Sequence, residues 1–246
     1  MKRFLSLLVA VAALCVAAAP LRADPPAGKI RVLLTHGGHA FDKPAFFALF
    51  DGLPDVKYTA AELPRELDLL KPGLEKQYDA LVMYDMNPKI TPEQQKSFKA
   101  LLEKGIGVVA LHHNLGAHRN WPEYRKIIGG QFILGPTEID GKTWPKSTWS
   151  HDETIPVTIV DRNHPITKGL SDFTIHDETY GGFWVNPGVH LLLATNHPKN
   201  SPQLAWVTRY AASPVVYLML GHDAKAYSNP NYRELVARSI RFVARP

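Results

Sequence analysis

The chain has 246 residues, and its 28 Lys and Arg exceed its 23 Asp and Glu, which gives a formal net charge of +5. Lys2, Arg3 and Arg22 lie near the N-terminus, so a chain without its first 23 residues would carry only +2, with 25 basic residues against 23 acidic ones. That remainder has no long run of Lys or Arg and no basic stripe interleaved with aromatic residues. Nucleic acid is therefore not expected as a partner.

The first residues follow the pattern of a secretory signal peptide. Lys2 and Arg3 precede an apolar run from Phe4 to Ala19, which is short for a membrane span, and small residues follow it. We expect cleavage after Ala23 and export to the periplasm or the medium, with no stable membrane span after processing. An uncleaved anchor is the alternative.

Cys15 is the only cysteine in the chain, so the mature protein would have none. It would then have no disulfide, no thiolate metal ligand and no cysteine nucleophile, and its fold must depend on a hydrophobic core. Lipoprotein processing at Cys15 is a further alternative, although Leu14 stands where a small residue is required. The expected organisation is a signal peptide at 1–23, a short linker at 24–28 and a single domain at 29–246.

Apolar runs in the chain predict strands that alternate with helices. The N-terminal half contains expected strands at 29–34, 56–60, 78–84 and 107–111, and expected helices at 44–53 and 91–104. The C-terminal half contains an expected helix at 121–128, strands at 155–160, 189–194, 203–208 and 214–220, and a final helix at 231–243. This order implies right-handed crossovers and an α/β fold with a mostly parallel central sheet and helices on both faces.

Two local patterns refine this outline. Thr91, Pro92 and Gln94 predict a helix start with a capping box. The segment 131–150 is rich in Gly, Pro, Thr and Trp and is either a functional insertion or a hairpin.

Polar residues able to transfer protons or bind metals follow several apolar, strand-like runs. They are His36 and His39, His112 and His113, Asp177 and Glu178 after the run 173–175, and His222. In an open α/β sheet, ligands bind outside the carboxyl ends of the strands. We therefore expect His36 or His39, His112, Glu178 and His222 to converge, with the side-chain ends of the last three within about 10 Å of one another.

Imidazoles and carboxylates at one edge suit acid–base chemistry or metal binding. His112, Glu178 and His222 are the candidate catalytic residues and, alternatively, the ligands of a divalent metal such as Zn²⁺. Either neighbouring histidine at 112 and 113 can instead pack in the core. Because groups at this edge add little to the core, replacing Glu178 or His222 is expected to change stability by about 0.5 kcal/mol or less.

Other residues near the same edge are candidates for substrate binding. Glycines give a ligand room to approach backbone amides, or else form a tight turn, and aromatic side chains beside a carboxylate can form the wall of a sugar pocket. The candidates are Gly37, Gly38, His39, His113, Asp177, Tyr180 and Trp184.

The order of these motifs resembles the ThuA-like family, which is named for a trehalose-utilisation protein. The resemblance covers about residues 29–244. It rests on the glycine-histidine turn after the first strand, 107–112 with Trp121-Pro122-Glu123-Tyr124 and Gly129-Gly130, His151, His164-Pro165-Ile166-Thr167 with Gly169-Leu170, Asp177-Glu178-Thr179-Tyr180, Ala205-Trp206 and Gly221-His222-Asp223.

The resemblance implies a flavodoxin-like α/β fold similar to class I glutamine amidotransferases. It also implies a role in carbohydrate metabolism, particularly of oxidised (3-keto) sugars. In those amidotransferases a Cys follows the central strand, where this chain has His112 and His113. The chain is therefore not expected to be a Cys-dependent amidotransferase.

The leading functional hypothesis is an exported enzyme that acts on a glycoside or keto-sugar by hydrolysis, elimination or isomerisation. Its partner would be a small-molecule carbohydrate, and nothing in the sequence specifies an oligomeric state. A second hypothesis is a non-catalytic carbohydrate-binding or accessory protein that stacks sugars on Trp184, Tyr180 and Trp144 or Trp149. A third is a partner module on an amidotransferase-like scaffold. The sequence contains neither GxSxG nor HExxH, which disfavours two hydrolase classes.

We expect the mature protein to begin at Asp24 and to be exported, because Lys2, Arg3 and the apolar run after them form a signal peptide. N-terminal sequencing of periplasmic or secreted material tests this expectation. Intact Met1 on protein from the soluble cytoplasmic fraction would contradict it.

Overall fold

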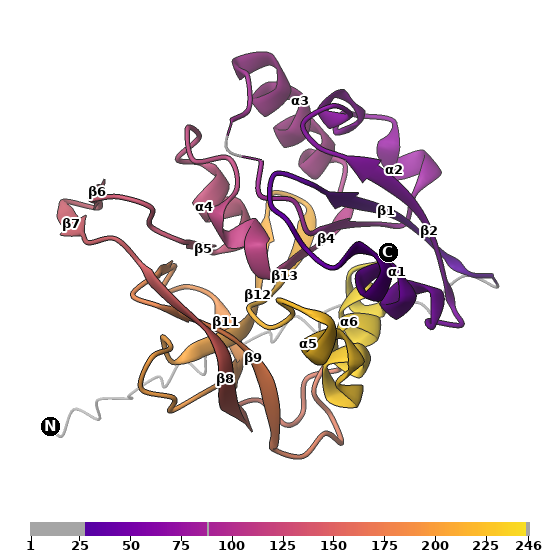
Figure 1. Cartoon of the computed structure of the whole chain (residues 1–246). Coiled ribbons are helices and arrows are strands. Elements are labelled where there is room, and N and C mark those ends of the chain that lie inside the picture. Colours follow the sequence, from indigo (N-terminus) through magenta and orange to yellow (C-terminus); the bar gives the residue numbers. More distant parts are fainter. Residues whose placement is uncertain (1–27, 88, 245–246) are drawn as a thin grey trace, which may run out of the picture.

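The computed structural model describes residues 28–87 and 89–244, so the expected signal peptide and almost all of the expected linker lie outside the described residues. Within this part of the chain, nine strands form one mixed sheet in the order β2-β1-β3-β4-β13-β12-β11-β8-β9 (Figure 1). No helix in the described ranges is long and apolar enough to cross a bilayer.

One half of the sheet is parallel and the other is antiparallel. The parallel strands are β2 (Val56–Glu62), β1 (Ile30–His36), β3 (Ala80–Met83), β4 (Gly107–Leu111) and β13 (Ser213–Leu218). The antiparallel extension consists of β12 (Gln203–Tyr210), β11 (His190–Ala194), β8 (Thr148–Ile159) and β9 (Phe173–Gly181). The predicted α/β fold is confirmed, and the parallel strands of its sheet are the five from β2 to β13.

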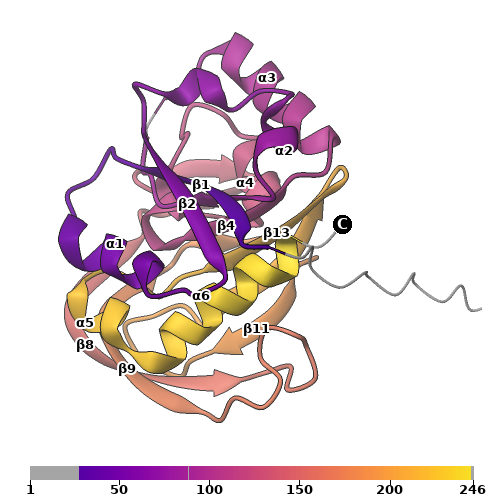
Figure 2. The same ribbon diagram turned by 90° about the vertical axis from the view of Figure 1, so that its right-hand side faces the viewer.

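Helices cover both faces of the parallel strands. On one face, α1 (Lys43–Asp51), α5 (Ala224–Ser228) and α6 (Pro230–Val243) lie together, with α6 against β3, β4 and β13 (Figure 2). On the other side lie α3 (Pro92–Glu103) and α4 (Tyr124–Ile128), the latter in contact with β12 and β13 (Figure 1). The short α2 (Leu74–Gln77) and η1 (Leu67–Leu69) precede β3, and η2 (His112–Gly116) follows β4.

Local chemistry accounts for the best-predicted elements. The Thr91 hydroxyl accepts the Gln94 amide at 3.3 Å, and the Gln94 side chain accepts the Thr91 amide at 3.0 Å, so the expected capping box is present. Every residue of β4 is buried, as predicted for an uncharged strand covered on both faces. Helix α6 turns Leu235, Val236 and Ile240 into the same core.

One open expectation about the C-terminal half is resolved, and another is wrong. The segment 131–150 contains a hairpin of β6 (Thr137–Ile139) and β7 (Lys142–Trp144) that reaches out from the body, and β5 (Gly130–Gln131) pairs with β10 (Trp184–Val185) (Figure 1). The expectation that Asp177 and Glu178 follow a strand is wrong, because β9 pairs with β8 through Gly181. Polar residues point inward on this strand, so its apolar run ends before the strand does.

Gly107 stands where β4 contacts α6, and a Cβ atom there would lie 2.6 Å from the Val243 carbonyl carbon. We expect Gly107→Ala to lower the free energy of unfolding by about 1–3 kcal/mol, as overpacking does. Gly135→Ala is the matched control, because a Cβ at Gly135 meets nothing within 4 Å. Urea unfolding measures both variants, and equal stability of the two would contradict the packing described here.

Candidate functional site

Four side chains meet at the carboxyl ends of the parallel strands. His112, His113, Glu178 and His222 each offer one ligand atom, and these atoms all lie within 4.8 Å of one another. The expected convergence of His112, Glu178 and His222 is confirmed. His113, which was expected to bind substrate, belongs to the same cluster.

His112 is the first residue after β4 and is fully buried, with a left-handed φ of 38°. Non-glycine residues rarely adopt this conformation, and it persists only where the surroundings hold it. The His112 Nδ1 donates to the Met219 carbonyl. The backbone carbonyl of His112 accepts a hydrogen bond from the Tyr217 hydroxyl at 3.0 Å. Its Nε2 therefore faces Glu178 Oε2 and the Tyr180 hydroxyl, each at 3.0 Å.

With its proton on Nδ1, a neutral His112 presents an Nε2 lone pair to the lone pairs of the Glu178 carboxylate. Two acceptors at 3.0 Å require a cation between or on them. That cation is either a proton shared with Glu178 or a metal ion. The arrangement thus supports both roles predicted for this pair.

Glu178 lies inside β9, where alternate residues face opposite sides of the sheet. Glu178 and Tyr180 point toward the cluster. Burial raises the pKa of Glu178, but the hydrogen bond to His112 and the nearby His222 ring outweigh burial and hold the pKa well below its usual range. Burial lowers the pKa of His222, but the Glu178 carboxylate more than offsets this, so the pKa lies above its usual value.

Several buried ring nitrogens in the cluster have no hydrogen-bond partner among the described residues. They are both nitrogens of His113 and Nδ1 of His222. The His222 Nδ1 is 3.1 Å from Glu178 Oε2, close enough for an ion pair but not aligned as a hydrogen bond. Burial, followed by the nearby His112, lowers the pKa of His113 well below its usual value. A neutral imidazole carries a lone pair on one of its two ring nitrogens. Buried rings whose nitrogens converge without hydrogen-bond partners therefore offer lone pairs that suit a cation.

Asp177 does not face the cluster, although it was expected to bind substrate. It is buried, and its carboxyl oxygens accept the backbone amides of Gly221 at 2.7 Å, His222 at 3.0 Å and Glu178 at 2.8 Å. It ties β9 to the turn after β13. The side chain therefore fixes the positions of Glu178 and His222 relative to each other.

The other predicted residues are placed in different surroundings. Gly37 and Gly38 form a tight turn with φ of 116° and 74°. His36 is buried against Phe41 and Phe47 and does not reach the cluster. Trp184 is buried with Ile133 and Ile139, away from the cavity described next.

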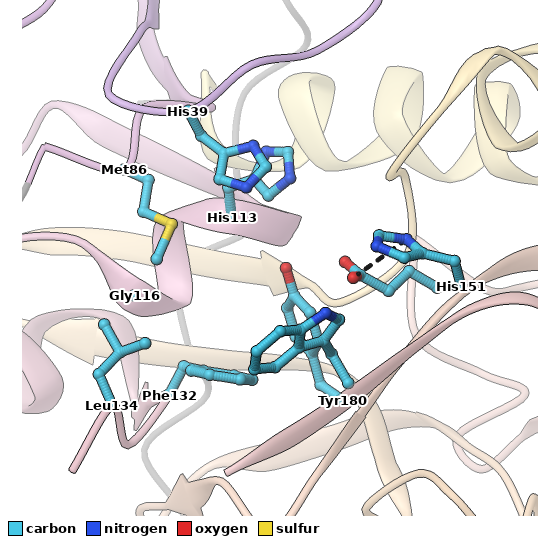
Figure 3. A pocket seen from close by; sticks show the side chains of 10 residues that line it. His39, Met86, His113, Gly116, Phe132, Leu134, His151 and Tyr180 are labelled. Carbon is cyan, nitrogen blue, oxygen red and sulfur yellow. Dashed lines mark ion pairs between the residues drawn. The ribbon is translucent and has the colours of Figure 1, made fainter. Parts of the chain in front are cut away.

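A cavity of about 240 Å³ opens beside the cluster (Figure 3). Its polar side comprises His39, His113, His151 and Glu178. The remaining lining is mostly apolar and consists of Met86, Gly116, Phe132, Leu134, Trp149 and Tyr180. His39 stacks on His113 with ring centroids 4.1 Å apart. No Lys or Arg occurs among these lining residues.

His151 is a cavity residue whose role sequence reasoning left open. Pairing between β8 and β9 shifts register between Ser150 and Glu153, and Asp152 in this bulge has φ of 59°. The bulge aims His151 at the site, with Nδ1 3.3 Å from Glu178 Oε1. Trp149, two residues earlier on the strand, lines the same cavity with half of its surface exposed.

Comparison with solved structures defines the class of the fold. The chain is similar to PurLQS from Thermotoga maritima, with a TM-score of 0.55, 10% identity and coverage of 87% of this chain and 99% of that one. A protein from Thermoplasma acidophilum described as a GMP synthase subunit is similar as well, with a TM-score of 0.54 and 10% identity. That alignment covers 88% of this chain and 94% of the other. The fold is therefore that of class I glutamine amidotransferase-like proteins.

The family is more specific. The ThuA family model, described as trehalose utilisation, matches residues 32–243, and the chain belongs to this family. ThuA-like proteins from Parabacteroides merdae and Bacteroides uniformis have similar structures, with TM-scores of 0.72 and 0.65 and 19% identity each. The first alignment covers 88% of this chain and 90% of the Parabacteroides protein. The second covers 92% of this chain and 95% of the Bacteroides protein. A comparison with curated proteins found no match.

Glu178 should stabilise the metal-free fold more in acid than in base. The pKa of His222 is raised in the folded chain above the value of about 6.5 expected in the unfolded chain. Its charged pair with Glu178 therefore stabilises the fold fully below that unfolded pKa, and this stabilisation is lost as the pH rises through the folded pKa. The lowered pKa of Glu178 keeps its charge at both pH 5.5 and pH 8.5. We expect Glu178→Gln, in chelator, to lower Tm more at pH 5.5 than at pH 8.5.

The control is His190→Gln, which removes the exposed ion pair of His190 with Asp161. Exposed pairs contribute little, so its Tm should change little at either pH. An equal loss of Tm for Glu178→Gln at both pH values would contradict the pairing of Glu178 with His222.

Proposed function

We propose that this chain is a sugar-active enzyme that binds a divalent metal such as Zn²⁺ through His112, His113, Glu178 and His222. Its substrate would be a glycoside or a keto-sugar. The observation that supports the proposal most directly is that one ligand atom each of His112, His113, Glu178 and His222 lies within 4.8 Å of the others, beside a cavity. Among the described residues, both ring nitrogens of His113 and Nδ1 of His222 have no hydrogen-bond partner.

The donor set fits such an ion. Imidazole nitrogen and carboxylate oxygen are usual zinc ligands. The bond from His112 Nδ1 to the Met219 carbonyl fixes the ring and turns Nε2 toward the cluster. Metal-binding histidines typically have an outer partner of this kind. A proton shared by His112 and Glu178 is the alternative, and the pair would then act as an acid and base.

When bound, a divalent metal polarises a carbonyl or lowers the pKa of water. The chain's own residues would orient the substrate and move protons. His151 is half exposed and lies next to Glu178, so it can exchange protons between the cavity and solvent. Trp149, Phe132 and Tyr180 offer apolar surface to one face of a sugar ring. The absence of Lys and Arg from the lining favours an uncharged saccharide.

The family description, trehalose utilisation, supports a carbohydrate substrate. Proton abstraction beside a ketone suits a site built from imidazoles and a carboxylate, which supports a keto-sugar within that class. Export to the periplasm or the medium is part of the proposal. It is supported by the N-terminal sequence pattern, which lies outside the described residues.

A non-catalytic carbohydrate-binding protein is the second candidate. It is favoured by Trp149, which is 50% exposed at the edge of the cavity and tilts against Phe132. An exposed aromatic face beside polar groups is suited to stacking on a sugar. This function needs no metal and no proton transfer.

We expect Glu178→Gln and His222→Ala to reduce turnover of a glycoside or keto-sugar by roughly 10²–10⁴-fold, as loss of an acid–base group does. Both should also lower the bound metal measured by elemental analysis. The sequence predicts that replacing Glu178 changes stability by only about 0.5 kcal/mol, a value typical of surface positions. The Glu178 side chain is only 5% exposed, so a larger change is expected. Its removal leaves buried imidazoles without their anion, so Tm should fall as well.

Glu138→Gln is the matched control, because it makes the same chemical change on the exposed hairpin strand β6. It should keep turnover, metal content and Tm. Full turnover in Glu178→Gln and His222→Ala with loss of sugar affinity alone would favour the binding protein. Unchanged metal content in both variants would contradict the metal site.

A further inference from the structure

The turns that follow β1, β3 and β4 are joined through one buried residue, Asp85. The Thr35 hydroxyl, near the end of β1, donates to Asp85 Oδ1 at 2.7 Å. The Asn114 side-chain amide, in the turn after β4, donates to the Asp85 backbone carbonyl at 3.0 Å. Asp85 therefore contacts the end of β1, from which the chain turns to His39, and the turn that begins at His112. Both turns supply histidines to the cavity.

Backbone contacts around Asp85 hold the same turns close together. The Tyr84 amide donates to the Thr35 carbonyl at 2.9 Å, and the Met86 amide donates to the Gly37 carbonyl at 2.8 Å. A Cβ at Gly38 would lie 2.7 Å from the Met86 carbonyl carbon, so the two segments pack backbone against backbone. The separation of the turns is thus closely defined on both sides of Asp85.

His39 from the first turn stacks on His113 from the second, with ring centroids 4.1 Å apart and planes 29° from parallel. His39 Nδ1 donates to the Ala40 carbonyl at 2.7 Å, which ties that ring to its own turn. Neither ring nitrogen of His113 has a hydrogen-bond partner among the described residues. The His113 ring contacts the rings of His39, Tyr84, His112 and His222.

Burying the carboxyl group of Asp85 costs free energy, because the group loses its contact with water. Asp85 is fully buried, and burial raises its pKa to about 6. Its Oδ2 has no hydrogen-bond partner in the described chain, and the His118 Nε2 is 4.0 Å away. An apolar side chain would avoid this desolvation. Departures of this kind from an apolar interior are expected at functional sites.

We propose that Asp85 is a positioning residue that holds the His36–His39 turn against the His112–Gly116 turn and so maintains the His39–His113 stack at the cavity. Its effect on the ring stack is independent of what the site binds. Its effect on metal affinity rests on the proposed function.

The most direct test replaces Thr35 by Val, which keeps the shape of the side chain and removes its hydroxyl. Thr35→Ser is the matched control, because it restores the donor to Asp85. NMR of wild type should show the His39 ring protons shifted upfield by the His113 ring beneath them, with assignment from His39→Gln. We expect Thr35→Val to lose this upfield shift and Thr35→Ser to keep it.

A second pair of variants changes the acceptor. Asp85→Ala should also lose the upfield shift, whereas Asp85→Asn keeps an oxygen that can accept from Thr35 and should retain it. Titration with Co²⁺ adds a second readout. We expect roughly tenfold weaker binding in Thr35→Val and Asp85→Ala, as for other groups that orient metal ligands.

A purely structural role would lower Tm and leave the ring shift unchanged in Thr35→Val and Asp85→Ala, and this result would overturn the proposal. Absence of the shift from the wild-type spectrum would overturn it as well. If wild type binds no Co²⁺, the proposed metal centre fails, and the comparison of ring shifts still decides the role of Asp85.

Discussion

The Glu178 carboxylate lies 3.0 Å from the His112 ring and 3.1 Å from the His222 ring, with only 5% of its side chain exposed. Removing a carboxylate from water costs several kcal/mol unless a positive charge is close. Histidine nitrogens surround the carboxylate, and Asp177 fixes the backbone on both sides of the pair. This combination of groups suits a cation, whether a proton or a metal ion.

The two halves of the sheet contribute different parts of this site. The parallel half supplies histidines from the turns after β4 and β13, at the edge where α/β folds bind ligands. The antiparallel half supplies Glu178 from β9 and His151 from the bulge of β8. His112 follows β4 of the parallel half in a strained conformation, with φ of 38°, and presents its imidazole at this edge.

The sequence was informative where one physical signal dominates. Uncharged runs such as Gly107–Leu111 identify strands buried on both faces, and a capping box identifies the start of α3. These signals predict the parallel half, and with it the positions of His112 and His222. The prediction that His112 and His222 lie close together is correct, because residues at the carboxyl ends of parallel strands share one edge of the sheet.

Other features depend on long-range pairing that no local pattern reveals. Strand β9 continues through Glu178 because β8 pairs with it, although its inward residues are polar. The bulge that aims His151 has no sequence signal, since its register depends on the partner strand. Trp184 illustrates the reverse case. It was expected in the pocket because it follows Tyr180 closely, but β10 pairs with β5 and buries it elsewhere.

The central claim is that His112, His113, Glu178 and His222 surround a single cation site. The most direct measurement is a crystal structure of zinc-loaded protein with anomalous data collected on both sides of the zinc absorption edge. We expect one peak at about 2.0–2.2 Å from imidazole nitrogens and a Glu178 oxygen. Zinc-loaded crystals with no anomalous peak among these four side chains, or with zinc bound only elsewhere, would contradict the account.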